Sequence, residues 1–134
     1  MQRDWYITQE SALGDIANKV ATLCPEQCFL ALHGNLGSGK TTFAKHLGHV
    51  WGIEDVKSPS FDIVHIHQGM RRLIHIDAFR LDEKAVFDWD DLCHAPFCVL
   101  IEWPERLVLP FTFQLQVYFS IQSGKVRHIY LETV

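Results

Sequence analysis

Eight consecutive residues carry the clearest chemical signal in this 134-residue sequence. The run Gly34-Asn35-Leu36-Gly37-Ser38-Gly39-Lys40-Thr41 satisfies the pattern G-x-x-x-x-G-K-[ST] at every fixed position. Glycines here allow backbone conformations in which successive N–H groups point at one phosphate, where a side chain would obstruct the approach. The run therefore predicts a phosphate-binding loop (P-loop) for a nucleoside triphosphate, which we expect to be ATP.

The last two residues of this run predict which groups bind the phosphate charge and the metal ion. Lys40 can reach the β- and γ-phosphates as a mobile positive charge, and the Thr41 hydroxyl can coordinate Mg²⁺, which prefers oxygen ligands. A helix that follows the loop would add its free N-terminal amides. We expect ATP and Mg²⁺ as cofactors, held by a continuous stretch of loop and helix: Asn35, Leu36, Gly37, Ser38, Gly39, Lys40, Thr41 and Thr42.

Two carboxylates stand directly after apolar, strand-like runs. Residues 73–76 precede Asp77, and residues 98–101 precede Glu102. The carboxyl ends of buried parallel strands meet at the sheet edge where a P-loop also lies, so both acids should face the phosphates. We expect Asp77 to act on the metal shell and Glu102 to position or deprotonate water, with an exchange of these roles left open. Both are candidate metal ligands, and with Lys40 they form the expected catalytic set.

Hydrophobic periodicity places the loop between a strand and a helix. Residues 28–33 form a nearly continuous apolar run, typical of a strand buried on both faces, and residues 40 to about 51 predict a helix closed by Gly52. An apolar stripe over residues 13–23 predicts an earlier helix, with Thr8 as its N-cap. Strand, glycine-rich turn and helix is the context that a P-loop requires.

The remaining segments predict mostly strands. Residues 5–7 form a candidate edge strand, and Asp82 is expected to cap a short helix that carries Ala85, Trp89 and Leu92. Hairpins are expected at residues 61–67 with 72–77 and at residues 111–120 with 126–134. We therefore expect residues 1–134 to form a single-domain α/β P-loop NTPase. Its mixed sheet would have central parallel strands and antiparallel hairpins, flanked by helices.

Composition bears on the partners and the cellular location that such a protein can have. The chain is 48% hydrophobic and 21% charged with a net charge of -4, which argues against a large basic face for nucleic acid. No apolar run approaches the roughly 18 residues of a membrane-spanning helix, and the first residues do not resemble a secretory signal. We expect a cytoplasmic protein without a membrane partner.

Cysteine and histidine spacings offer weaker alternatives. The cysteines form two spaced pairs, Cys24 with Cys28 and Cys93 with Cys98. A zinc site can be imagined from these pairs, but free thiols in the core are the favoured interpretation. Three histidines fall on the first expected hairpin: His65, His67 and His75. They could form a metal site, but a solvated strand face is the favoured interpretation.

Three further segments add specificity to the P-loop. They read V-K-S-P-S-F at residues 56–61, H-I-D-A-F-R at residues 75–80 and I-E-W-P-E-R at residues 101–106. In this order, and along nearly its whole length, the chain resembles the TsaE family, also called YjeE. These are small bacterial ATPases of the tRNA threonylcarbamoyladenosine pathway.

The resemblance implies roles for residues and partners. It implies that Lys40 and Thr41 bind phosphate and Mg²⁺, that the Ser60 hydroxyl replaces a switch threonine on the metal, and that Trp103 belongs with Asp77 and Glu102 to the active region, near the nucleotide. It also implies that ATP hydrolysis resets a complex of TsaD and TsaB, which modifies adenosine 37 of tRNAs reading ANN codons. Contact with tRNA would then be indirect, through that complex.

Four positions depart from the family pattern. The family usually has Asp, Ala, Thr and Tyr where this chain has Asn35, Ser38, Ser60 and Phe79. Ser60 keeps a hydroxyl, so the metal role survives. Asn35 removes a charge beside the phosphates, and Phe79 removes a hydrogen-bonding group.

Two other functions share the P-loop. A small-molecule kinase would need an acceptor pocket and usually an arginine-bearing lid, whereas the chain after Glu102 predicts strands. A non-catalytic nucleotide sensor would use the same loop. A GTPase is disfavoured because no N-K-x-D guanine-binding motif follows the P-loop.

Overall fold

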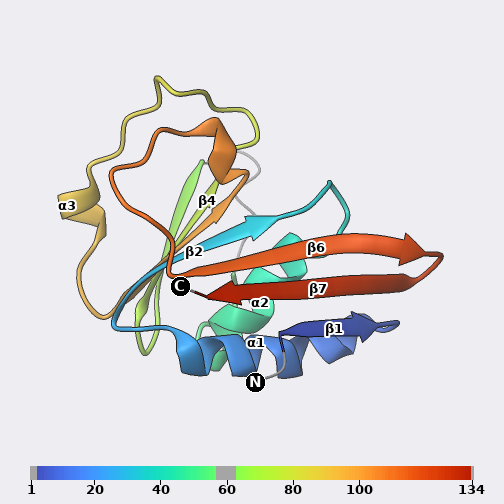
Figure 1. Ribbon diagram of the computed structural model, residues 1–134. Helices are drawn as coiled ribbons and strands as arrows, with labels where there is room; N and C mark the ends of the chain where they lie inside the picture. Colours follow the sequence, from blue (N-terminus) through green and yellow to red (C-terminus); the bar gives the residue numbers. More distant parts are fainter. Residues whose placement is uncertain (1–2, 57–62, 134) are drawn as a thin grey trace.

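One mixed seven-stranded sheet organises the protein (Figure 1). The computed structural model describes residues 3–56 and 63–133. The strands are β1 (Asp4–Ile7), β2 (Gln27–His33), β3 (Val64–Gln68), β4 (Arg72–Asp77), β5 (Phe97–Glu102), β6 (Leu115–Ser123) and β7 (Val126–Thr133). The α-helices are α1 (Leu13–Leu23), α2 (Lys40–Val50) and α3 (Trp89–Leu92), and two short 3₁₀ helices are η1 (Glu10–Ala12) and η2 (Pro104–Arg106).

The strand order is β1-β7-β6-β2-β5-β4-β3. Four neighbouring strands, β6, β2, β5 and β4, run parallel, while β3, β7 and β1 are antiparallel to their neighbours. The expected α/β fold with central parallel strands and antiparallel hairpins is therefore confirmed. The second hairpin differs in one respect, because its first strand is not peripheral: β6 pairs in parallel with β2 and so extends the central sheet.

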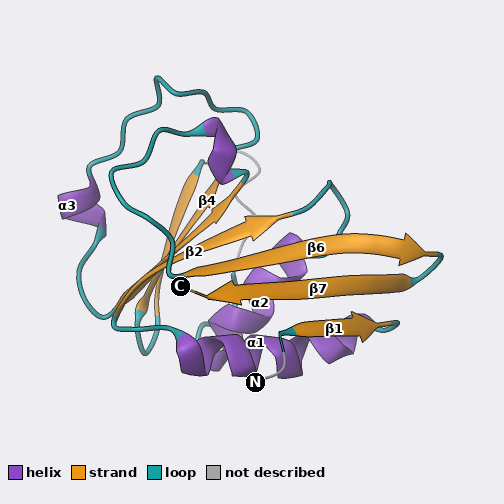
Figure 2. Ribbon diagram, in the orientation of Figure 1, coloured by secondary structure: helices purple, strands orange, loops and turns teal. Residues whose placement is uncertain are grey.

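The two faces of the sheet are covered differently (Figure 2). Helices α1 and α2 lie on one face, over a core that includes Leu30, Leu32 and Leu100. The other face packs a smaller core, including Ile74 and Ile101, against α3 and the long connections around it. Strand β5 is buried along its whole length, as expected for a central strand covered on both sides.

Two local predictions are wrong. Thr8 does not cap a helix: the chain first forms η1, whose N-cap residue is Gln9 and makes no side-chain cap hydrogen bond. Asp82 caps a turn rather than a helix, because its side chain accepts a hydrogen bond from the Lys84 amide. The helix begins later, at α3, where the Asp88 carboxylate accepts from the Asp91 amide.

None of the helices within residues 3–56 and 63–133 is long and apolar enough to cross a membrane. This agrees with the absence of a long apolar run in the sequence.

Truncation of the central strand should cost much of the stability. Leu100 is fully buried on β5, so Leu100→Ala is expected to lower the free energy of unfolding by about 2–5 kcal/mol through a cavity in the core. The matched control is Ile121→Ala on β6, where the side chain is 53% exposed and the expected loss is below about 1 kcal/mol. Urea denaturation monitored by circular dichroism measures both. Equal losses would contradict the assignment of β5 to the core.

Candidate functional site

The glycine-rich run forms the turn between β2 and α2. Gly37 and Gly39 have φ values of 78° and 112°, in the left-handed region that glycine adopts without strain. Gly34 is required for close approach, since a Cβ there would lie 2.7 Å from the Phe119 carbonyl oxygen and 2.6 Å from Ser38 Oγ. These constraints explain the glycine positions by backbone geometry, as the sequence pattern predicts.

The start of α2 offers donors for an anion. Its N-cap residue, Gly39, has no side chain to cap the helix. The first i to i−4 hydrogen bond runs from the Phe43 amide to the Gly39 carbonyl oxygen. The amides that precede Phe43 in the first turn have no intrahelical acceptor, so they can donate to a ligand. Because the helix dipole also favours negative charge at this end, the turn suits a phosphate group.

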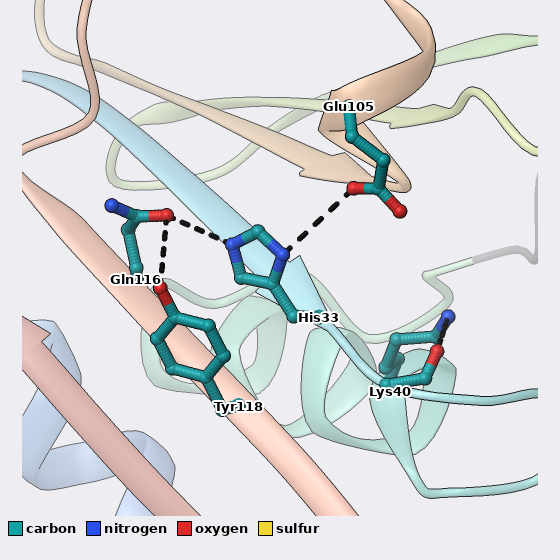
Figure 3. Close-up of polar contacts among 6 residues, drawn as sticks. His33, Lys40, Glu105, Gln116 and Tyr118 are labelled. Carbon is teal, nitrogen blue, oxygen red and sulfur yellow. Dashed lines mark hydrogen bonds and ion pairs between the residues drawn. The ribbon is translucent and has the colours of Figure 1, made fainter.

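Lys40 lies at the centre of the site. The residue is only 4% exposed, and its Nζ atom donates a hydrogen bond to the Gly34 carbonyl oxygen at 2.5 Å (Figure 3). The same Nζ lies 4.1 Å from the centre of the Trp103 ring, a cation–π contact. Burial lowers the pKa of Lys40, and the nearby carboxylates of Glu102 and Asp77 act in the opposite direction. An ammonium has three donors, so one carbonyl and one ring leave capacity for an anionic ligand.

Asp77 and Glu102 end adjacent parallel strands and face each other in register. The Asp77 Oδ1 atom accepts a hydrogen bond from the Phe79 amide at 3.0 Å, which fixes the carboxylate at the strand end. The two acids were predicted to meet at this edge, and their pairing confirms the placement.

A buried histidine orients Glu102. His75 Nε2 lies 2.7 Å from Glu102 Oε2, and the two residues are 0% and 3% exposed. An ionised carboxylate only accepts, so His75 donates from Nε2. His75 Nδ1 is buried and has no hydrogen-bond partner among the described residues. His75 therefore holds one oxygen of Glu102, and the interpretation of His75 as part of a solvated face is wrong.

A cleft of about 300 Å³ joins the loop to both acids. Most of the predicted set lines it: Leu36, Gly37, Gly39, Lys40, Thr41, Thr42, Asp77 and Glu102. Two residues that sequence reasoning missed also line it, Glu10 from η1 and Arg127 from β7. No local motif marks Arg127, which reaches the cleft because β6 runs parallel to β2 and so delivers the start of β7 to this edge.

Three predicted residues lie beside the cleft instead of lining it. Asn35 and Ser38 line a neighbouring hollow next to Phe119, and the Ser38 Oγ atom is buried without a hydrogen-bond partner in the described residues. Trp103 contacts Lys40 through its ring. The backbone of Trp103 has a φ of 59°, the only positive φ of a non-glycine residue in the described ranges. The predicted metal ligand Ser60 lies outside the described residues.

A polar cluster fixes the end of β2 just before the loop (Figure 3). His33 Nε2 lies 2.8 Å from Gln116 Oε1, and the His33 ring stacks on Tyr118 with centroids 4.5 Å apart. On its other side, His33 Nδ1 lies 3.9 Å from a Glu105 oxygen, which forms an ion pair when the ring is protonated. The cluster thus ties the loop entrance to β6 and to η2.

Comparison with known proteins agrees with this arrangement. The family model described as threonylcarbamoyl adenosine biosynthesis protein TsaE matches residues 7–129. A Bacillus subtilis protein named tRNA threonylcarbamoyladenosine biosynthesis protein TsaE is 33% identical over 105 residues, which cover 76% of this chain and 66% of that relative. A Streptomyces coelicolor protein of the same name is 32% identical over 128 residues, 86% of either chain.

A solved structure extends the agreement to the fold. The crystal structure of YdiB from Bacillus subtilis superposes with a TM-score of 0.74 at 25% sequence identity, and it covers 98% of this chain and 85% of that one. The family match spans the loop, both strand-end acids and the second hairpin as far as residue 129, so it includes every residue that lines the cleft. The chain is a member of the TsaE family of tRNA threonylcarbamoyladenosine biosynthesis proteins.

Proposed function

We propose that this protein binds and hydrolyses ATP with Mg²⁺ and thereby serves the enzymes that place threonylcarbamoyl on adenosine 37 of tRNAs reading ANN codons. The cleft carries the proposal, because Lys40 and the start of α2 line it together with two carboxylates. Positive and negative groups in one cleft suit a phosphate chain with a bridging divalent cation.

The loop residues would bind the phosphates and the metal. Lys40 would turn from the Gly34 carbonyl toward the phosphates, where its charge offsets the charge of the transferring group. The Thr41 hydroxyl, at the start of α2, would be a metal ligand, and bound Mg²⁺ would neutralise phosphate charge. The donor set of the described residues, an ammonium, amides, a hydroxyl and carboxylates, fits this pair of cofactors.

Burial favours different roles for the two acids. Glu102 is 3% exposed and is oriented by His75, so it suits the positioning or deprotonation of water, which needs a fixed carboxylate. Asp77 is less buried and ends the neighbouring strand, where a carboxylate can hold the water shell of Mg²⁺. Arg127, on the wall of the cleft, would add positive charge near the phosphates.

Hydrolysis is proposed to act on partner proteins, the complex of TsaD and TsaB, which contacts the tRNA. Family membership supports this role, and the net charge of -4 is consistent with indirect contact with tRNA. The protein is expected to work in the cytoplasm. A kinase or a nucleotide sensor remains the alternative, and the experiments below separate the three functions.

Removal of the lysine charge should weaken ATP binding. Lys40→Ala is expected to weaken ATP affinity at least about tenfold, since a hydrogen bond to a charged group contributes roughly 1.5–3 kcal/mol. Lys45→Ala is the matched control, an exposed lysine on the same helix, and should bind ATP as the wild type does. Isothermal titration calorimetry measures both. Equal affinities for the two variants would contradict the proposed phosphate site.

The two acids should separate catalysis from metal binding. Glu102→Gln is expected to lower the ATP hydrolysis rate by about 10²–10⁴-fold while ATP affinity stays within a few-fold, because the general base is lost. Asp77→Asn should instead raise the Mg²⁺ concentration needed for half-maximal hydrolysis. A phosphate-release assay over a Mg²⁺ titration distinguishes them. The opposite pattern would show that the acids have exchanged roles.

Partner proteins should control turnover. We expect slow ATP hydrolysis by the protein alone, faster hydrolysis after addition of TsaD and TsaB, and no stimulation of Lys40→Ala or Glu102→Gln. Transfer of phosphate to a small acceptor would identify a kinase instead. ATP binding without any hydrolysis, with or without partners, would identify a sensor.

A further inference from the structure

Three cysteines converge at the sheet edge opposite the ATP cleft. Cys24 follows the last residue of α1, Cys28 lies near the start of β2, and Cys98 lies near the start of β5. Cys28 and Cys98 face each other in register on adjacent parallel strands. The three Sγ atoms lie within 4.8 Å of one another, and all three thiols are free.

The separation of the sulfurs suits a shared metal ion. With metal–sulfur bonds of about 2.3 Å, three sulfurs in a plane around one ion lie roughly 4.0 Å apart. The observed spacing therefore needs a contraction of less than about 1 Å, within reach of side-chain rotation. Cys24 has the freedom for this movement, since it lies outside the strands and is partly exposed. Its Sγ donates to the Val20 carbonyl at 3.4 Å, a weak bond that a metal would replace.

A positive charge lies beside the thiols. Cys28 and Cys98 are fully buried, and the Arg71 guanidinium donates to the carbonyl oxygens of Pro25 at 2.7 Å and Phe97 at 3.3 Å. Pro25 follows Cys24 in the chain and Phe97 precedes Cys98. Because a thiolate is the form that binds metal, a guanidinium at this position would offset the negative charge of bound thiolates.

We propose that Cys24, Cys28 and Cys98 bind one soft metal ion through three thiolates. Sulfur ligands select soft ions such as Cu⁺ and Zn²⁺ over Mg²⁺. Among the described residues no histidine, carboxylate or fourth cysteine joins the group, which favours three-coordinate Cu⁺ over Zn²⁺, whose structural sites take four ligands.

The site is separate from the proposed ATP chemistry. Cys28 precedes the P-loop by most of the length of β2, which places the thiols roughly 20 Å from it at about 3.3 Å per residue. The ion would instead join the end of α1 to β2 and β5. Because it binds the folded chain through groups brought together by folding, it should also raise the thermal midpoint of unfolding.

Metal titration of the reduced full-length chain tests the site. The apo protein is titrated in two arms, with Cu⁺ against a chromophoric Cu⁺ chelator and with Zn²⁺ against a chromophoric Zn²⁺ chelator. We expect one ion per chain in at least one arm. Cys24→Ser should weaken that binding by about 100-fold or more, since loss of even an outer-shell partner costs roughly 10–100-fold. Cys24 is the safest ligand to replace, because it lies outside the buried strands.

The fourth cysteine supplies the matched control. Cys93 is partly exposed and lies outside the cluster, so Cys93→Ser should keep wild-type stoichiometry and affinity. Circular dichroism of metal-free Cys24→Ser checks that its fold is intact. One-to-one binding that depends on Cys24 and not on Cys93 supports the site, and the responding arm identifies the ion. The proposed site would be overturned if the wild type bound neither Cu⁺ nor Zn²⁺. It would also be overturned if Cys24→Ser and Cys93→Ser changed metal binding equally.

Discussion

Parallel pairing among β2, β5 and β4 is the constraint on which the cleft depends. Because these strands run in the same direction, the P-loop that follows β2 lies at the same edge as Asp77 and Glu102, which pair in register. Side chains alternate between faces, so a slip of one residue in either pairing would turn these carboxylates to the wrong side of the sheet. β5 is buried along its whole length and ends in Glu102, so a slip would also separate this buried carboxylate from its partner His75. Strand pairing and burial thus fix the geometry of the charged site together.

Charge burial at this edge is tolerated because each charged group has a partner. Lys40 and Glu102 are 4% and 3% exposed, and an unpaired ion in such a place would be strongly destabilising. Lys40 has the Gly34 carbonyl and the Trp103 ring, and Glu102 has His75. The His75 contact crosses from β4 to β5, so the same pairing that aligns the strands also supplies the partner of the buried carboxylate.

The sequence was most informative where one short pattern dictates local structure. The P-loop, the buried strands and the acids that end them were all predicted, because glycine spacing and continuous apolar runs constrain the backbone directly. Predictions failed where tertiary contacts decide. Asp82 resembles a helix cap, yet its side chain closes a turn, and Arg127 has no motif because only the parallel pairing of β6 brings it to the cleft. The thiol cluster likewise combines a helix end with two strands, so the spacing of the two cysteine pairs could not show that Cys98 joins Cys24 and Cys28 while Cys93 stays outside.

The contact between Lys40 and Trp103 bears on how nucleotide occupancy could be sensed from outside the cleft. A phosphate attracts an ammonium more strongly than an aromatic ring does in the same surroundings, so bound ATP would draw Lys40 away from Trp103. Trp103 has a left-handed backbone conformation and lies 5.0 Å from the Phe79 ring, with the Arg106 guanidinium 5.5 Å from that ring. Loss of the lysine contact would therefore alter the packing of Trp103, the residue that connects β5 to η2, against Phe79. Under the proposed function, the segment after Glu102, which lies beside the cleft, would then be well placed to report nucleotide occupancy to a partner.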